Sequence, residues 1–163
     1  MKRGILAIHS CPMALIRHVE WSIESVLGND LSAQSSQANH INNFRWRNQP
    51  LIAGTQRTEV EWRSKRDCTS ELASALKGWH YLRFEITFDN QLFRHTPDLG
   101  LHRATIDEFG NICITENQIK SAMSKTDQLM REQLDVTLGT EWEMELERFR
   151  GVDLQEIEHL RAI

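Results

Sequence analysis

A run of strictly alternating residues is the feature that most limits how this chain can fold. From Leu82 to Phe88, large apolar side chains alternate with polar ones. A period of two places the apolar set on one face of a strand and the polar set on the other. Burial of each large apolar side chain stabilises a fold by about 1.5–3 kcal/mol. We therefore predict a strand with one face against the core and the other toward solvent.

The segments that precede this strand indicate a fold class. One helix is expected to enter at Ser10-Cys11-Pro12 and to stop at Gly28, and a second, shorter helix stops at Gly78. The polar segment between Asn29 and Asn43 is expected to be a loop. Strands are predicted at residues 4–9, 44–47, 57–63 and 82–88. Between residues 4 and 88 the order is therefore βαββαβ, which is typical of a ferredoxin-like unit with two helices on one face of an antiparallel sheet.

The remaining sequence predicts more strands and then helices. Short strands at residues 92–95, 101–106 and 112–114 would extend the sheet or form a second one. Thr115-Glu116-Asn117-Gln118 is a capping box that predicts a helix start, and Gly139 predicts a stop. We expect a single α+β domain over residues 1–163. Its parts are a ferredoxin-like βαββαβ unit (4–88), additional antiparallel strands (89–114) and a C-terminal helical tail (115–163).

Composition excludes several classes of protein. The formal net charge of −4 argues against a protein that binds nucleic acid by its overall charge. No stretch approaches the roughly 20 apolar residues of a membrane span. The three cysteines, Cys11, Cys68 and Cys113, are far apart and odd in number, which indicates reduced thiols. We predict a cytoplasmic protein with no nucleic-acid or membrane partner.

The end of the first predicted strand is the first candidate site. His9 and Ser10 would lie where free backbone N–H groups of the following helix can bind an anion, and His18 follows on that helix. A neighbouring imidazole and hydroxyl could also exchange protons with a ligand. His9, Ser10 and His18 are therefore candidates for a ligand pocket. The alternative is that Ser10 only caps the helix and that His9 is a core residue.

Other chemistry has less support in the sequence. His80, His95 and His102 match no zinc-binding spacing, and no phosphate-binding glycine loop occurs. Cys11 could be a stabilised thiolate near a helix start, although a small buried residue explains it as well. We predict no catalytic residue, no metal and no cofactor.

A basic segment is the second candidate site. Between Arg45 and Arg66 there are six basic residues and two acidic ones. This charge predicts either a solvated face or a surface for an acidic protein. The acidic residues between Glu141 and Glu158 raise a further alternative, contact between the two patches across a homo-oligomer. The candidate partner-binding residues are Arg45, Arg47, Arg57 and Arg63.

Short motifs spread over nearly the whole chain resemble a known family. They are HSCPMAL at residues 9–15, HVEW at 18–21, ASALKGW at 73–79, LRFE at 82–85, TPDLG at 96–100, LGTEW at 138–142 and ELERFR at 145–150. Together they resemble the uncharacterised actinobacterial family labelled domain of unknown function 3145. The resemblance brings no activity and no catalytic residue. It implies a link to type II fatty-acid synthesis, with an acyl carrier protein as the acidic partner.

Two functions follow as hypotheses from different classes, beside a third reading, an oligomer whose edge strands pair between copies. The first is a non-catalytic protein-binding or regulatory module that works through the four arginines. The alternative is a small enzyme or metabolite-binding protein with its pocket around the end of the first strand.

Overall fold

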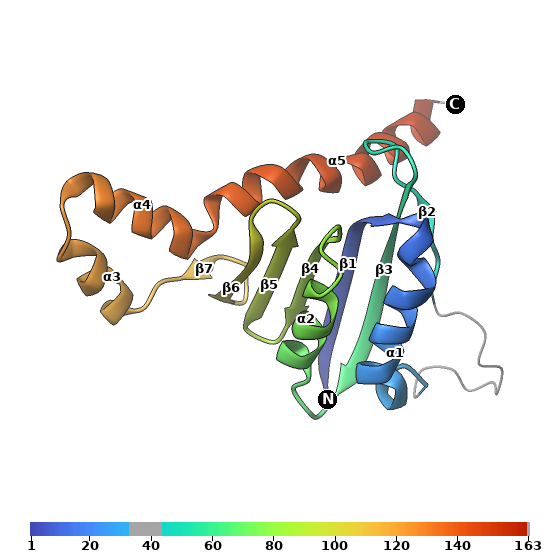
Figure 1. Cartoon of the computed structure of the whole chain (residues 1–163), viewed down its shortest axis with the longest axis horizontal. Coiled ribbons are helices and arrows are strands. Elements are labelled where there is room, and N and C mark those ends of the chain that lie inside the picture. Colours follow the sequence, from blue (N-terminus) through green and yellow to red (C-terminus); the bar gives the residue numbers. More distant parts are fainter. Residues whose placement is uncertain (33–43, 163) are drawn as a thin grey trace.

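An antiparallel sheet of seven strands, in the order β2-β3-β1-β4-β5-β6-β7, organises the molecule (Figure 1). The computed structural model describes residues 1–32 and 44–162, with side chains described outside 29–32 and 153–162. The strands are β1 (Lys2–Pro12), β2 (Arg47–Asn48), β3 (Thr55–Ser64), β4 (Arg83–Phe88), β5 (Gln91–Thr96), β6 (Gly100–Ile106) and β7 (Ile112–Cys113). The helices are the short 3₁₀ turn η1 (Met13–Leu15), α1 (Ile16–Ser32), α2 (Thr69–Lys77), α3 (Glu116–Met123), α4 (Asp127–Leu138) and α5 (Thr140–Ala162).

The core lies between one face of this sheet and the helices α1 and α2. Strand β1 is central and pairs antiparallel with both β3 and β4, so that Leu6 lies between Val60 and Ile86. These three side chains are buried, as the alternating patterns predict. Helices α1 and α2 lie side by side over this face (Figure 1).

Helix α5 packs on the opposite face of the sheet. It contacts β1 and β5, and its buried residues Leu146 and Phe149 point to the sheet. The spacing of Trp142, Leu146 and Phe149 already predicts one apolar stripe on this helix. The sheet is therefore covered on both faces near the end of β1.

The part between β7 and α5 differs from the single long helix that the sequence suggests. The capping box at Thr115 is confirmed, but the helix ends at Met123 and α4 begins at Asp127. Gly139 ends α4 in the left-handed conformation, with φ of 66°. Helices α3 and α4 pack on each other and project beyond the β7 edge (Figure 1).

The start of the chain also differs from the prediction. Residues Ser10-Cys11-Pro12 continue β1 and do not start a helix; α1 begins at Ile16. Gly28 does not end α1, which runs to Ser32. Much of the predicted loop at 29–43 lies outside the described residues.

The strand predicted at residues 44–47 is shorter and shifted, because only Arg47 and Asn48 pair with β3. The strands predicted after Phe88 extend the same sheet and do not form a second one. The α+β class is confirmed. Among the described residues, no helix is both long and apolar enough to cross a membrane.

Candidate functional site

An irregularity in β1 shapes the region around His9 and Ser10. The pairing of β1 with both neighbouring strands shifts register just after Ile8. A bulge of this kind re-aims side chains and is common next to binding sites. His9 Nε2 lies 2.7 Å from Glu85 Oε2, whereas Ser10 is buried and its hydroxyl accepts a hydrogen bond of 3.4 Å from Arg83 Nη1. No hydrogen bond joins the side chains of His9 and Ser10, so these two described residues do not form an acid–base pair.

His18 belongs to another surface. It lies on α1, where its ring stacks on Trp79 at 5.4 Å between ring centroids. Trp79 in turn donates a hydrogen bond from its indole N–H to Ser22. Because α1 covers the face of the sheet opposite to α5, His18 does not join His9. The sequence alone places the three candidates together; the structure brings only His9 and Ser10 to one place.

A groove opens beside this bulge. It has a volume of about 590 Å³ and is lined by Leu51, Ile52, Arg83, Arg148 and Phe149. Leu51 and Ile52 come from the loop between β2 and β3, Arg83 begins β4, and the other two residues come from α5. We refer to these five residues as the α5 groove.

Buried polar contacts hold both walls of the α5 groove. The Gln49 amide donates to the carbonyl of His9 at 2.7 Å and accepts from the backbone N–H of Leu51 at 3.1 Å. Arg83 Nε donates to Glu145 on α5 at 2.9 Å. The loop wall is therefore tied to β1 and the helix wall to β4.

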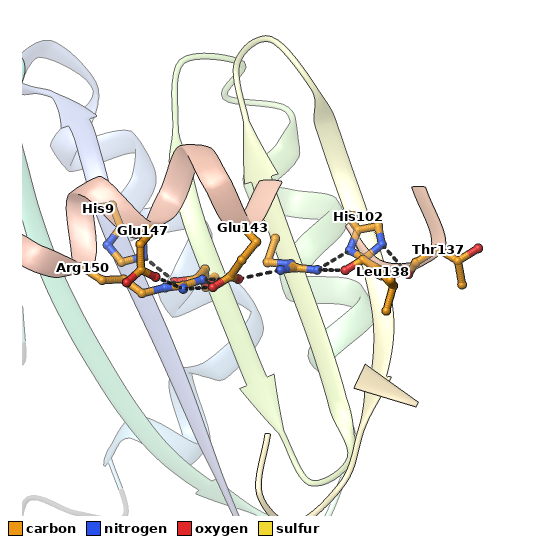
Figure 2. A network of polar contacts seen from close by, with 9 residues as sticks. His9, His102, Thr137, Leu138, Glu143, Glu147 and Arg150 are labelled. Carbon is orange, nitrogen blue, oxygen red and sulfur yellow. Dashed lines mark hydrogen bonds and ion pairs between the residues drawn. The ribbon is translucent and has the colours of Figure 1, made fainter. Parts of the chain in front are cut away.

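A chain of ion pairs fixes α5 along the sheet (Figure 2). Arg150 donates to Glu85 on β4 and to Glu143 and Glu147 on its own helix. Glu143 also accepts from Arg94 on β5 at 2.9 Å. The chain continues from Arg94 to the carbonyl of Leu138 and to His102, which itself bonds to the carbonyl of Thr137 at 3.1 Å. We name this set, from His9 to His102, the α5 network.

The centre of the α5 network, formed by Glu85, Glu143 and Arg150, is charged at neutral pH. Burial alone would raise the pKa of Glu85, but hydrogen bonds from His9 and Arg150 outweigh burial and hold this pKa at about 2. Hydrogen bonds to Glu85 and Glu143 raise the pKa of Arg150. Hydrogen bonding to Arg150 also lowers the pKa of Glu143. A carboxylate with a pKa near 2 is a weak proton acceptor at neutral pH, so the network anchors α5 and is poorly suited to general base catalysis.

The four candidate arginines do not form one patch. Arg47 lies opposite Arg57 in the β2–β3 pair, and Arg45 precedes it. Arg45 and Arg47 are exposed, but Arg57 is buried and donates from Nε to the carbonyl of Asn48. Arg63 lies six residues farther along β3, opposite Arg3.

The other chemical candidates are also separated. His95 is buried on the core side, where it stacks on Phe84 at 5.1 Å and bonds to the carbonyl of Leu82, whereas His102 lies on the α5 side and His80 is exposed. Within the described residues, no three His, Cys, Asp or Glu side chains gather as a metal site would require. Cys11 is buried, and burial raises the pKa of its thiol to about 12, which argues against a thiolate nucleophile.

Sequence reasoning did not find most of the α5 groove. Phe149 belongs to the apolar stripe predicted on α5, but the sequence gives no reason to distinguish its neighbour Arg148 from other exposed charged residues. Leu51 and Ile52 lie in a loop and follow no periodic pattern. The usable signal is the pair of apolar residues between Pro50 and Gly54, which a solvated turn does not need.

Comparison with known proteins gives a family and no function. The model of a family described as "Protein of unknown function (DUF3145)" matches residues 5–161. No curated protein and no solved structure matches the chain.

Proposed function

We propose that this chain, which belongs to the DUF3145 family, is a non-catalytic binding module whose ligand occupies the α5 groove. The observation that carries the proposal is the groove itself, about 590 Å³ between the β2–β3 loop and α5. Its lining combines apolar side chains with two guanidinium groups. Ligand sites typically combine a largely apolar lining with a few polar groups that fix orientation.

The nearby reactive groups support binding over catalysis. His9 is engaged by Glu85, and within the described part of the chain the Ser10 hydroxyl bonds to Arg83, which cannot act as a base. The Cys11 thiol is held protonated by burial. A small enzyme that uses His9 or Ser10 would need to break these contacts first.

The test blocks the groove and compares it with a matched surface. Leu51 in the groove and Leu129 on α4 are equally exposed, at 50% and 52%. We expect small metabolites from a host extract to raise the melting temperature of the wild type and of Leu129→Trp, but not of Leu51→Trp. A rise that survives Leu51→Trp, or no rise in the wild type with any fraction, would contradict the proposal.

An acidic protein is a second candidate ligand, docked on Arg45 and Arg47. The observation that favours it is that both arginines are exposed and lie two residues apart, Arg47 in the edge strand β2 and Arg45 just before it. An acyl carrier protein is the partner suggested by the family resemblance. Partners that co-purify at low salt should be lost from a variant with Arg45→Glu and Arg47→Glu, and retained by Arg63→Glu. Equal recovery from all three proteins would remove this candidate.

We also infer that residues 4–88 form a ferredoxin-like unit in a cytoplasmic protein. The strand order β2-β3-β1-β4 supports the ferredoxin-like unit. Strands β3 and β4 flank β1 and are both antiparallel to it, so they run parallel to each other, and α2 connects them in the sequence. Three free cysteines support the cytoplasmic location. A homo-oligomer that pairs edge strands remains a further proposal, and a strict monomer in light scattering would exclude it.

A further inference from the structure

The charges around the α5 groove are unequal. Arg83 is balanced by Glu145, whose carboxylate is 2.9 Å from Arg83 Nε. Arg148 is exposed and forms no ion pair with any residue in the described part of the chain. The groove therefore carries one positive charge in excess.

The two guanidinium groups of the groove share one aromatic neighbour. Arg83 Cζ lies 5.1 Å and Arg148 Cζ lies 5.5 Å from the centroid of the Phe149 ring. Arg83 uses Nε for Glu145 and Nη1 for Ser10. Its Nη2 has no hydrogen-bond partner among the described residues and is not enclosed by the protein, so it can reach a ligand in the groove. The groove thus has N–H donors without acceptors, next to an exposed cation.

The opposite wall is apolar. Leu51 and Ile52 face the groove from the β2–β3 loop, and Leu51 is half-exposed. An apolar body that covers these two side chains would remove hydrocarbon surface from water, and an anion at its end would reach the guanidinium groups. Glu145 next to Arg83 would repel a second negative charge on the ligand.

We propose that the α5 groove binds an amphipathic monocarboxylate, with its carboxylate between Arg83 and Arg148 and its apolar body against Leu51 and Ile52. This inference rests on the proposed binding function and adds the class of ligand. Arg83 donates from Nη2, and Arg148 supplies the unbalanced charge.

The test uses four probes with the same chain and different ends: octanoate, octanol, octylamine and octyl phosphate. Each is titrated into the full-length protein at one ionic strength while NMR follows the Ile52 methyl groups and the Leu51 amide. We expect octanoate to shift these signals most strongly. Arg148→Met should weaken its binding about tenfold or more, because a hydrogen-bonded charge is lost. Arg131→Met, which removes an exposed arginine on α4, should leave binding unchanged.

The possible outcomes separate the ligand class from the groove itself. Equal shifts by octanol or octylamine, or octanoate binding that survives Arg148→Met, would overturn the monocarboxylate and leave the groove as a binding site. Tighter binding of octyl phosphate would replace the monoanion with a dianion. If no probe and no metabolite fraction acts at Leu51 and Ile52, both the ligand class and the proposed function fail.

Discussion

Arg94 and His102 lie opposite each other on β5 and β6, and Arg94 Nη2 donates a hydrogen bond of 3.2 Å to His102 Nδ1. Arginine can only donate, so Nδ1 of His102 must accept, and the ring proton must lie on Nε2, which donates to the carbonyl of Thr137. A second proton on this ring would point at a guanidinium group. The end of α4 is thus held by a histidine that must stay neutral.

This contact predicts a loss of stability in mild acid. Burial and the neighbouring Arg94 lower the pKa of His102 in the native state, whereas the unfolded chain keeps the ordinary value of 6.5. Between these two pKa values His102 binds a proton in the unfolded state but not in the native state. The free energy of unfolding therefore falls as the pH drops from about 6.5 toward the native pKa. Urea unfolding at about pH 7.5 and about pH 5.5 should show a larger loss for the wild type than for His102→Gln. His95, whose pKa burial also lowers, is unchanged in both proteins, so equal losses would contradict a role for His102.

Removal of the charge of Glu85 should loosen α5. Glu85→Gln leaves Arg150 and His9 without the carboxylate that they share. We expect a loss of about 2–3 kcal/mol in the free energy of unfolding, somewhat less than for a fully buried pair, since Arg150 is 32% exposed and keeps Glu143. The control is Glu71→Gln, which removes an exposed ion pair with Arg66 and should cost under about 1 kcal/mol. Equal costs for the two variants would contradict an anchoring role.

Gly4 is required by the packing of Trp62. A Cβ atom added at Gly4 would lie 2.2 Å from a ring carbon of this fully buried side chain. Gly4→Ala should therefore destabilise the protein by about 1–3 kcal/mol or more in denaturant unfolding. In contrast, Gly28 lies within α1 with no described residue within 4 Å of its Cβ position, and Gly28→Ala should stabilise by up to about 1 kcal/mol. A neutral Gly4→Ala would show that Trp62 can move at little cost.

The three thiols should differ in reactivity. Cys11 and Cys68 are buried and Cys113 is exposed. A thiol reagent under native conditions should modify one thiol per chain rapidly, and all three after unfolding. A Cys113→Ser variant should show no rapid phase. Fast modification of this variant would mean that the region around Cys11 or Cys68 opens readily.

The sequence predicts the regular parts of the fold well, for physical reasons. The alternation from Leu82 to Phe88 places one set of side chains in a dry core, so no other secondary structure satisfies it. The capping box at Thr115 and the glycine at position 139 work through local hydrogen bonds and one backbone dihedral angle. Local rules of this kind are visible in the sequence without knowledge of the fold.

The errors arise where tertiary contacts override local preference. Ser10-Cys11-Pro12 looks like a helix start, but pairing with Gln56 and Thr55 keeps this segment in β1. Gly28 looks like a helix stop, although α1 runs past it to Ser32. In the sequence, Arg57 and Arg63 look like parts of one basic patch. In the structure they lie six residues apart along β3, and the charge pattern alone does not show this separation.

The candidate site shows the same division. The sequence directs attention to the end of β1, but the partners of His9 and Ser10 are Glu85 and Arg83 on another strand, and nothing local predicts them. Arg148 becomes important only because Phe149 and Arg83 lie beside it. Such a site depends on which distant segments meet.

The location of the α5 groove ties recognition to the docking of α5 on the sheet. Its walls come from residues near 51, 83 and 148, so segments far apart in the sequence must meet before a ligand can bind. A partly folded protein in which α5 has left the sheet has only one wall of the groove and lacks Arg148 there, so it could not hold the ligand. Ligand affinity would then report how much of the protein has α5 in place.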